Sequence, residues 1–292
     1  MTAILMDGKA VAAETKQTLK EEAEYMKKVG VNPKIATILV GNDAPSKAYV
    51  ASKHRAAQEV GILSENHSLS GFAKEEEVAG LIDSLNADDS VSGILLQLPL
   101  PQHLDSRRLI ERISPAKDVD GLTSASMGLL FYGQASLIPC TPRGVMELLH
   151  HYKIQIAGSR AVIINRSALV GKPLFHLLVS EDATVTVCHS KSKDLLGITR
   201  QADILVSAVG QRPKFSVSPE MVKQGAVVID VAMNRLGGKL VGDVEFDGVS
   251  RKASYITPVP GGVGPMTVIM LMENTLIAAA KQHNLKEASI LR

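Results

Sequence analysis

The chain has 292 residues, 45% hydrophobic and 21% charged, which is typical of a folded globular protein with room for two domains. Its 32 basic and 30 acidic residues nearly balance, and the net charge of +2 excludes a strong overall attraction to nucleic acid or an anionic membrane. Aromatic residues make up only 3%, which leaves few stacking platforms for single strands, and two distant cysteines exclude a disulfide framework.

The first half of the chain alternates helix and strand patterns. An amphipathic helix at 9–28 ends at Gly30, and a buried strand follows at 35–40. Ser46 is a candidate N-cap for a helix that runs to Val60 and stops at Gly61. The remaining predicted elements are a strand at 64–69, a helix at 74–85, a strand at 91–98 and a helix at 104–113.

The pattern restarts after a boundary near 139–142. Helices are predicted at 143–151 and 172–179, and strands at 161–164, 184–188, 204–209 and 227–231. Strands and helices joined by short connections predict parallel sheets with helices on both faces. We therefore expect an α/β fold of two three-layer α/β domains, the second a Rossmann-like parallel sheet, with a cleft between them.

Targeting signals are missing from the sequence pattern. The N-terminal segment lacks the basic and apolar order of a signal peptide, and no uncharged apolar run reaches the ~18 residues of a membrane span. We expect a cytoplasmic protein without a membrane partner.

The strand at 161–164 is followed by a turn at 165–172, where the free N–H groups of a helix start favour a phosphate. Asn165 and Ser167 stand where a dinucleotide fingerprint has its first two glycines, and Asn tolerates a left-handed backbone. The turn thus predicts either a dinucleotide site or an ordinary connection.

The residues after the strand at 184–188 indicate whether the cofactor is NADP or NAD. An NAD site places a carboxylate there, whereas this chain has hydroxyl and basic groups up to Asp194. Together with Arg166 they suit a 2′-phosphate, so NADP is favoured over NAD, and a solvated basic turn is the alternative.

The first half contains a second set of polar groups at strand ends. Tyr49 and Lys53 lie four residues apart, on one face of a helix, and Gln97 closes the strand at 91–98. Asp118 and Asp120 follow in the next loop. An amine, a phenol, an amide and a carboxylate in one crevice could orient and protonate a nitrogen heterocycle, although the two acids could instead only cap a turn.

The segment 257–267 carries three prolines and three of the chain's glycines close together. Such a backbone is rigid and tightly turned, and it lets a flat ligand approach closely. A rigid hinge is the structural alternative.

Five motifs give the chain a resemblance to a known family: 49–53 (YVASK), 97–101 (QLPLP), 117–121 (KDVDG), 139–142 (PCTP) and 257–267 (TPVPGGVGPMT). With these motifs the chain resembles the bifunctional methylenetetrahydrofolate dehydrogenase/methenyltetrahydrofolate cyclohydrolase family. The resemblance implies oxidation of 5,10-methylenetetrahydrofolate with NADP, hydrolysis of the product to 10-formyltetrahydrofolate, and a homodimer. It also implies a folate-binding catalytic domain at 1–139, completed by a C-terminal helix at 268–292, and an NADP-binding domain at 140–267.

The resemblance also implies site residues. Lys53 is the key catalytic residue, Tyr49 packs against the folate, Gln97 tunes Lys53 and Asp120 holds the pterin; further folate contacts are Leu98, Pro99, Pro260, Gly261 and Gly262. The cofactor contacts are Asn165, Arg166, Ser167, Gly171, Lys172, His189, Ser190, Ala208, Val209, Gly210 and Val231. No metal is expected.

The departures from the family lie in the cofactor half, where Asn165, Ala232 and Ser192 stand in place of Gly, Gly and Thr. We expect Asn165 to weaken cofactor binding by crowding the turn. The alternatives are a dehydrogenase resembling shikimate dehydrogenase, a nucleotide-binding protein without turnover, and retention of one activity.

Overall fold

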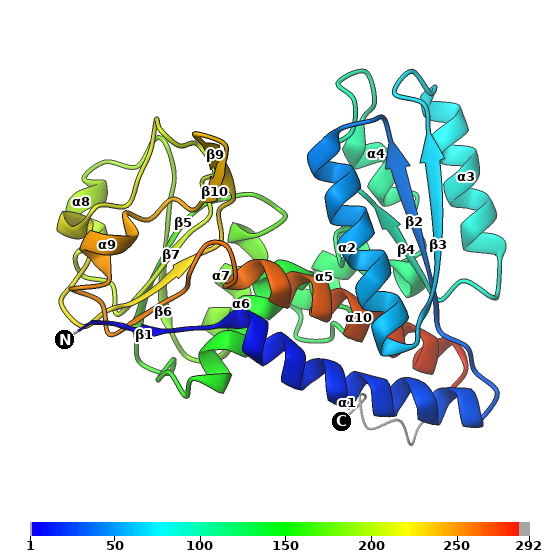
Figure 1. Ribbon diagram of the computed structural model, residues 1–292, viewed down its shortest axis with the longest axis horizontal. Helices are drawn as coiled ribbons and strands as arrows, with labels where there is room; N and C mark the ends of the chain where they lie inside the picture. The colour runs from blue at the N-terminus through cyan, green and yellow to red at the C-terminus, as the bar shows by residue number, and fades with distance from the viewer. Residues whose placement is uncertain (1, 286–292) are drawn as a thin grey trace. The chain divides into compact units, whose positions relative to one another are not determined.

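The computed structural model describes residues 2–285, which divide into two units (Figure 1). The first unit contains residues 14–140 and 268–285, and the second contains residues 2–13 and 141–267. Helices α1 (Gly8–Lys28), α6 (Cys140–His151) and α10 (Val263–Gln282) have residues in both. The last part of the predicted helix at 268–292, from residue 286 on, lies outside the described residues.

The first unit is built on a three-stranded parallel sheet in the order β3-β2-β4. Its elements are β2 (Lys34–Val40), α2 (Ala44–Val60), β3 (Leu63–Leu69), α3 (Glu75–Ala87), β4 (Gly93–Leu96), α4 (Ser106–Glu111), the 3-10 turn η1 (Pro115–Lys117) and α5 (Ser124–Phe131). Alternate residues of β2 and β4 share a hydrophobic core with α3 and α4, and α2 lies along the opposite face of the sheet (Figure 1). The carboxyl ends of the strands are therefore flanked by the start of α2.

The second unit is built on a six-stranded parallel sheet in the order β1-β11-β8-β7-β5-β6. The elements are β1 (Ile4–Leu5), β5 (Arg160–Ile164), α7 (Gly171–Ser180), β6 (Thr184–Cys188), α8 (Leu195–Thr199), β7 (Ile204–Ser207), the 3-10 turn η2 (Pro219–Met221), β8 (Val227–Asp230), β9 (Asn234–Leu236), β10 (Lys239–Val241), α9 (Phe246–Val249) and β11 (Tyr255–Ile256). β9 and β10 form a separate antiparallel hairpin. The sheet confirms the predicted α/β class and Rossmann-like parallel order.

Residues 2–13 differ from the predicted domain division, which gave them to the first domain. β1 pairs in parallel with β11, so it extends the sheet of the second unit. Both strands have only two residues, which is too short for a hydrophobic pattern to mark them. Their pairing satisfies backbone groups at the sheet edge, and this is what takes the first residues of the chain into the second unit.

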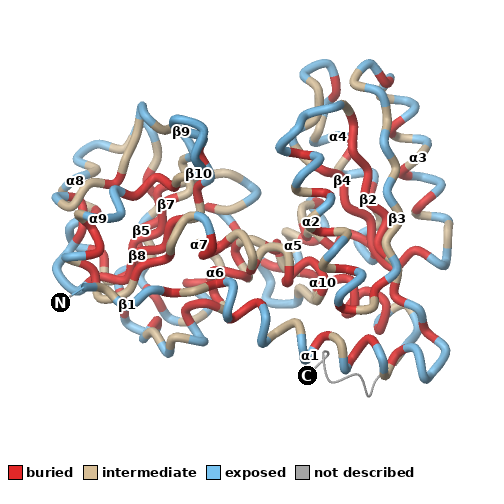
Figure 2. The backbone as a smooth tube through the Cα atoms, in the orientation of Figure 1, coloured by how far each residue is buried: buried red, intermediate tan, exposed pale blue. Residues whose placement is uncertain are grey.

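Among the described helices, one, α10, is long and apolar enough to cross a membrane. Most of it is buried inside the protein, as Figure 2 shows by its red segments. Its apolar character is therefore explained by core packing. Figure 2 also shows β2 and β4 buried, whereas the edge strand β3 alternates between exposed and intermediate residues.

Candidate functional site

Helix α2 presents Tyr49 and Lys53 at the carboxyl edge of the three-stranded sheet. The helix begins at Ala44, two residues earlier than the predicted Ser46 cap. Asp43 is the N-cap instead, and its carboxylate accepts from the Ser46 backbone N–H at 2.9 Å and from the Ser46 hydroxyl at 2.7 Å. Asp and Ser are both good caps, so only the structure separates them.

Lys53 is held by the strand that ends next to it. Its side chain is buried, with 8% exposure, and Nζ donates to Gln97 Oε1 at 3.0 Å. Gln97 follows β4 and donates its own Nε2 to Leu98 O at 2.6 Å, which fixes the carboxamide so that its oxygen faces the amine. Nζ also lies 5.1 Å from the centre of the Tyr49 ring. The structure thus brings these predicted residues together.

Burial and the charge of the partner act in opposite directions on Lys53 and Asp120. Burial lowers the pKa of Lys53, and the negative charge of Asp120 opposes that shift. Burial likewise raises the pKa of Asp120, where the charge of Lys53 acts the other way. Burial also raises the pKa of Tyr49. Loss of the Lys53 proton is therefore easier here than at an exposed lysine.

The two acids of the 117–121 loop have different roles. Asp118 is buried, and its carboxylate accepts from Thr123 N at 2.8 Å, from Ser126 Oγ at 2.7 Å and from Leu122 N at 3.1 Å. It therefore builds the start of α5, as the capping alternative predicted. Asp120 is instead the acid whose charge acts on Lys53.

A polar network behind Asp120 was not predicted as part of the site. The Cys140 thiol donates to Val119 O at 3.3 Å and lowers the pKa of the neighbouring Asp120 against the effect of burial. Asn274, fully buried in α10, donates Nδ2 to Val119 O and to Ile138 O, both at 2.8 Å. A buried amide within an apolar helix was the available sequence signal, and it fixes the backbone that carries Asp120.

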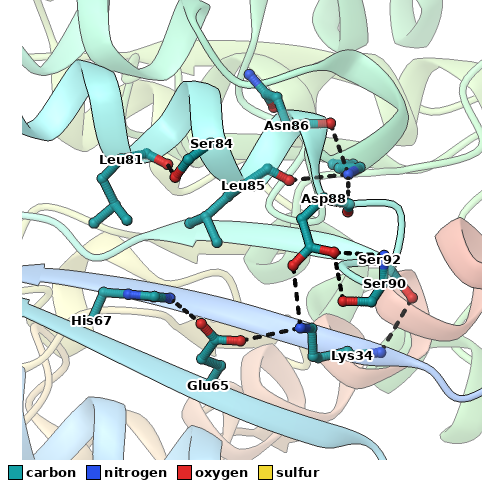
Figure 3. Close-up of polar contacts among 11 residues, drawn as sticks. Lys34, Glu65, His67, Leu81, Ser84, Leu85, Asn86, Asp88, Ser90 and Ser92 are labelled. Atoms are coloured by element: carbon teal, nitrogen blue, oxygen red, sulfur yellow. Dashed lines mark hydrogen bonds and ion pairs between the residues drawn. The ribbon is translucent and has the colours of Figure 1, made fainter.

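A second buried lysine lies at the opposite, amino edge of the same sheet. Lys117 Nζ donates to Leu85 O, Asn86 O and Asp88 O at 2.8–3.0 Å, at the end of α3. Its pKa is lowered by burial as well. Near it, Lys34 lies between Glu65 and Asp88, at 3.2 and 3.5 Å (Figure 3). These contacts give both amines a structural role.

The turn after β5 is closed by a side chain. Asn165 Oδ1 accepts from Ser167 N at 2.7 Å and from Gly171 N at 3.0 Å, and Nδ2 donates to Ala208 O at 2.6 Å. Asn165 does not use the left-handed backbone that asparagine tolerates, since the described non-glycine residues with positive φ do not include it. A Cβ at Gly171 would lie 2.2 Å from Asn165 O, so the helix start must stay bare there.

The segment after β6 exposes Ser190 and Lys191, next to the half-buried His189. The first acid of this segment, Asp194, is the N-cap of α8 and accepts from Gly197 N at 3.1 Å. Its carboxylate is therefore committed to a helix start. Arg166 and Lys172, on the turn before and within α7, are also exposed.

The loop after β7 is held by a buried acid that was not predicted. Asp243 accepts from Ser207 Oγ at 2.7 Å, from Val209 N at 2.8 Å and from Gly210 N at 3.1 Å. The neighbouring Asp230, at the end of β8, has its pKa raised to about 6 by burial. Val231 follows it and donates its N–H to Ser207 O at 2.8 Å. These contacts shape the predicted cofactor loops from behind.

The Pro-Gly segment is packed against the start of α1 within the second unit. Lys9 N donates to Gly261 O at 3.1 Å, and a Cβ on Gly8 would lie 1.9 Å from Gly262 O. Gly261 has a φ of 112°, which requires glycine, and the Val259–Pro260 bond is cis. Leu98 and Pro99, which also form a cis bond, belong to the first unit.

Comparison with known proteins identifies the family of this chain. Residues 6–120 match the family model "tetrahydrofolate dehydrogenase/cyclohydrolase, catalytic domain", and residues 139–283 match its "NAD(P)-binding domain". The chain belongs to the tetrahydrofolate dehydrogenase/cyclohydrolase family. It is an enzyme of one-carbon folate metabolism, with a methylenetetrahydrofolate dehydrogenase and a methenyltetrahydrofolate cyclohydrolase activity. The three alternatives to this reading are thereby set aside.

Individual members of the tetrahydrofolate dehydrogenase/cyclohydrolase family match along nearly the whole chain. The bifunctional protein FolD of Cenarchaeum symbiosum is 53% identical, with 94% of this chain and 98% of that protein covered. The crystal structure of the bifunctional enzyme FolD from Campylobacter jejuni has a TM-score of 0.93 at 48% identity, with 96% and 99% covered. That of Trypanosoma brucei, complexed with NADP cofactor and inhibitor, has a TM-score of 0.92 at 37% identity, with 98% and 99% covered.

Proposed function

We propose that Lys53 is the catalytic residue with which this enzyme converts 5,10-methylenetetrahydrofolate, through the 5,10-methenyl cation, to 10-formyltetrahydrofolate. One observation carries the proposal: Lys53 Nζ is buried and donates to Gln97 Oε1 at 3.0 Å. An amine in this setting can exchange a proton at a pH where an exposed lysine stays charged.

The neighbouring side chains support distinct tasks. Neutral Lys53 takes a proton from the water that attacks the methenyl carbon, and its ammonium returns that proton to the nitrogen released when the ring opens. The proton left on the added hydroxyl goes to solvent as the formyl C=O forms. Gln97 keeps Nζ at one position, Tyr49 packs against the folate, and Asp120 holds the pterin. Leu98, Pro99, Pro260, Gly261 and Gly262 complete the proposed folate contacts.

The cofactor we assign to the second unit is NADP rather than NAD. Bare backbone at Gly171 fits a dinucleotide phosphate, and the exposed Arg166, Ser190 and Lys191 fit a 2′-phosphate. Asp194 is engaged as a helix cap and leaves no acid for a ribose 2′-hydroxyl. The related Trypanosoma brucei enzyme was crystallised with NADP. When bound, NADP⁺ supplies the hydride acceptor.

The remaining proposed cofactor contacts lie at the same strand ends. Asn165, Ser167 and Lys172 belong to the first turn, His189 to the second, and Ala208, Val209, Gly210 and Val231 to the loops after β7 and β8. The discriminating measurement is binding of 2′,5′-ADP and 5′-ADP, followed by calorimetry. We expect 2′,5′-ADP to bind at least tenfold more tightly, and equal affinities would overturn the choice of NADP.

The activity test follows methenyl formation and its decay by absorbance, with each cofactor in turn. Methenyl formation only with a nicotinamide cofactor, then decay faster than in buffer, is the expected result. If the methenyl product forms but decays no faster than in buffer, the proposed role of Lys53 in hydrolysis is contradicted.

We further propose a homodimer in the cytoplasm. β3 is the outer strand of its sheet, and its Leu63 side chain is 52% exposed, which offers an edge and an apolar group to a second copy. Light scattering after size exclusion tests the dimer, and a monomer at micromolar concentration would contradict it. Cell fractionation tests the location.

A further inference from the structure

Asn165 occupies the position in the second sheet where the chain reverses its direction of winding. From β5 the chain proceeds outward to β6, and it then returns to β7 on the other side of β5 and continues to β8. The gap between the ends of β5 and β7 is therefore the topological switch point, where open α/β sheets bind their ligands. Asn165 directly follows β5, and its partner Ala208 directly follows β7.

The carboxamide of Asn165 uses the donors that this turn offers. Its Oδ1 accepts from Ser167 N at 2.7 Å and from Gly171 N at 3.0 Å, the latter being the first residue of α7. Its Nδ2 is anchored on Ala208 O at 2.6 Å. One oxygen thus accepts hydrogen bonds from two backbone N–H groups at a helix start, as a phosphate oxygen does at such a place.

We propose that Asn165 is an affinity-determining residue that competes with the cofactor's pyrophosphate for these N–H groups and must turn away when the dinucleotide enters. The inference rests on the cofactor site assigned under the proposed function. Each N–H makes one strong hydrogen bond, so the two acceptors exclude each other there. Turning the side chain also breaks the bond to Ala208, and dinucleotide binding is weakened by both losses.

The opposite role predicts the opposite result. If Asn165 were a brace that keeps the ends of β5 and β7 in their binding geometry, its removal would loosen both loops and weaken binding. The backbone at Asn165 does not require a positive φ, so alanine fits there without strain. Asn165→Ala therefore separates competition from bracing.

The experiment is calorimetric titration of NADP⁺ into the full-length wild type, Asn165→Ala and Asn165→Asp. We expect Asn165→Ala to lower the Kd about five- to tenfold, from the loss of two competing hydrogen bonds. Asn165→Asp should raise the Kd more than tenfold, because a carboxylate holds the N–H groups more firmly and repels phosphate. Inorganic pyrophosphate, titrated in the same way, should follow the same order.

Asn66→Ala, an exposed asparagine of β3 in the other unit, is the matched control and should leave the Kd unchanged. Melting temperatures without cofactor check that each variant is folded. An unchanged or higher Kd in folded Asn165→Ala overturns the proposal while leaving the cofactor assignment intact. Absence of NADP⁺ binding by the wild type overturns both.

Discussion

A buried lysine lies at each edge of the β3-β2-β4 sheet, and the two amines differ in their hydrogen-bond acceptors. At the amino edge, the Lys117 ammonium donates to three backbone carbonyl groups. At the carboxyl edge, Lys53 donates to one neutral amide and lies over the Tyr49 ring. Burial lowers the pKa of both amines, so that shift alone does not mark a catalytic lysine. The difference lies in how many of the ammonium protons have acceptors.

This comparison separates stability from chemistry. An ammonium with three acceptors is locked in its charged form, because losing a proton also loses a hydrogen bond. One with a single neutral acceptor can change its protonation state at lower cost. We therefore expect substitutions at the amino edge to affect unfolding and those at the carboxyl edge to affect turnover.

The largest effect is expected for Lys53→Met. The thioether fills the same space but carries no proton, so cyclohydrolase turnover should fall at least about 100-fold. The melting temperature should change little, because the amine contributes one bond to a neutral group. Near-normal turnover in this variant would refute the assignment of Lys53.

Lys117→Met tests the other edge. Three carbonyl groups at the end of α3 lose a charged donor, so the free energy of unfolding should drop by about 2–4 kcal/mol, measured with urea. Turnover of the remaining folded enzyme should stay within about twofold. A stable variant with lost activity would reverse the roles that we give to the two edges.

Asp120→Asn tests the comparison through the pH dependence of kcat. The Asp120 carboxylate raises the pKa of Lys53 against the lowering effect of burial. Without that charge the pKa falls, and the limb of the kcat profile that requires neutral Lys53 should move to lower pH, by about one unit. Asp89→Asn, whose charge acts on Lys117 at the amino edge, is the control and should leave the profile in place. A limb that moves to higher pH would contradict the sign of the interaction.

The smallest effect is expected for Lys34→Met. Its partners Glu65 and Asp88 are both about four-tenths exposed, so water and salt screen the ion pairs. Less than about 1 kcal/mol of unfolding free energy should be lost. A larger loss would show that this edge depends on charge pairing rather than on the carbonyl bonds of Lys117.

The long apolar strands and the glycine-marked helix ends were predictable because each depends on residues close in sequence. The strand predicted at 184–188 agrees with β6, and Gly61 ends α2 in a left-handed conformation. Helix α5 was not predicted, because its apolar residues do not gather on one face, and its start depends on Asp118, outside the helix.

Those residues of the candidate site that are polar and lie at the end of a strand or on one helix face could be predicted from the sequence. Tyr49, Lys53 and Gln97 were found in this way, since helix periodicity and strand ends fix their placement. The separation of Asp118 from Asp120 was not predictable, because both lie in one loop and differ only in their tertiary partners. Asp243 and Asn274 were missed for the same reason, as their partners are distant in sequence.

The interleaved course of the chain has a consequence for its synthesis on the ribosome. β1 pairs with β11, whose residues come 251 positions later in the chain, and the backbone beside Asp120 is held by Asn274 in the last described helix. Neither unit can acquire its full set of contacts while the chain is still growing. A truncated product ending before α10 therefore lacks parts of both units, and it cannot serve as a working half of the enzyme.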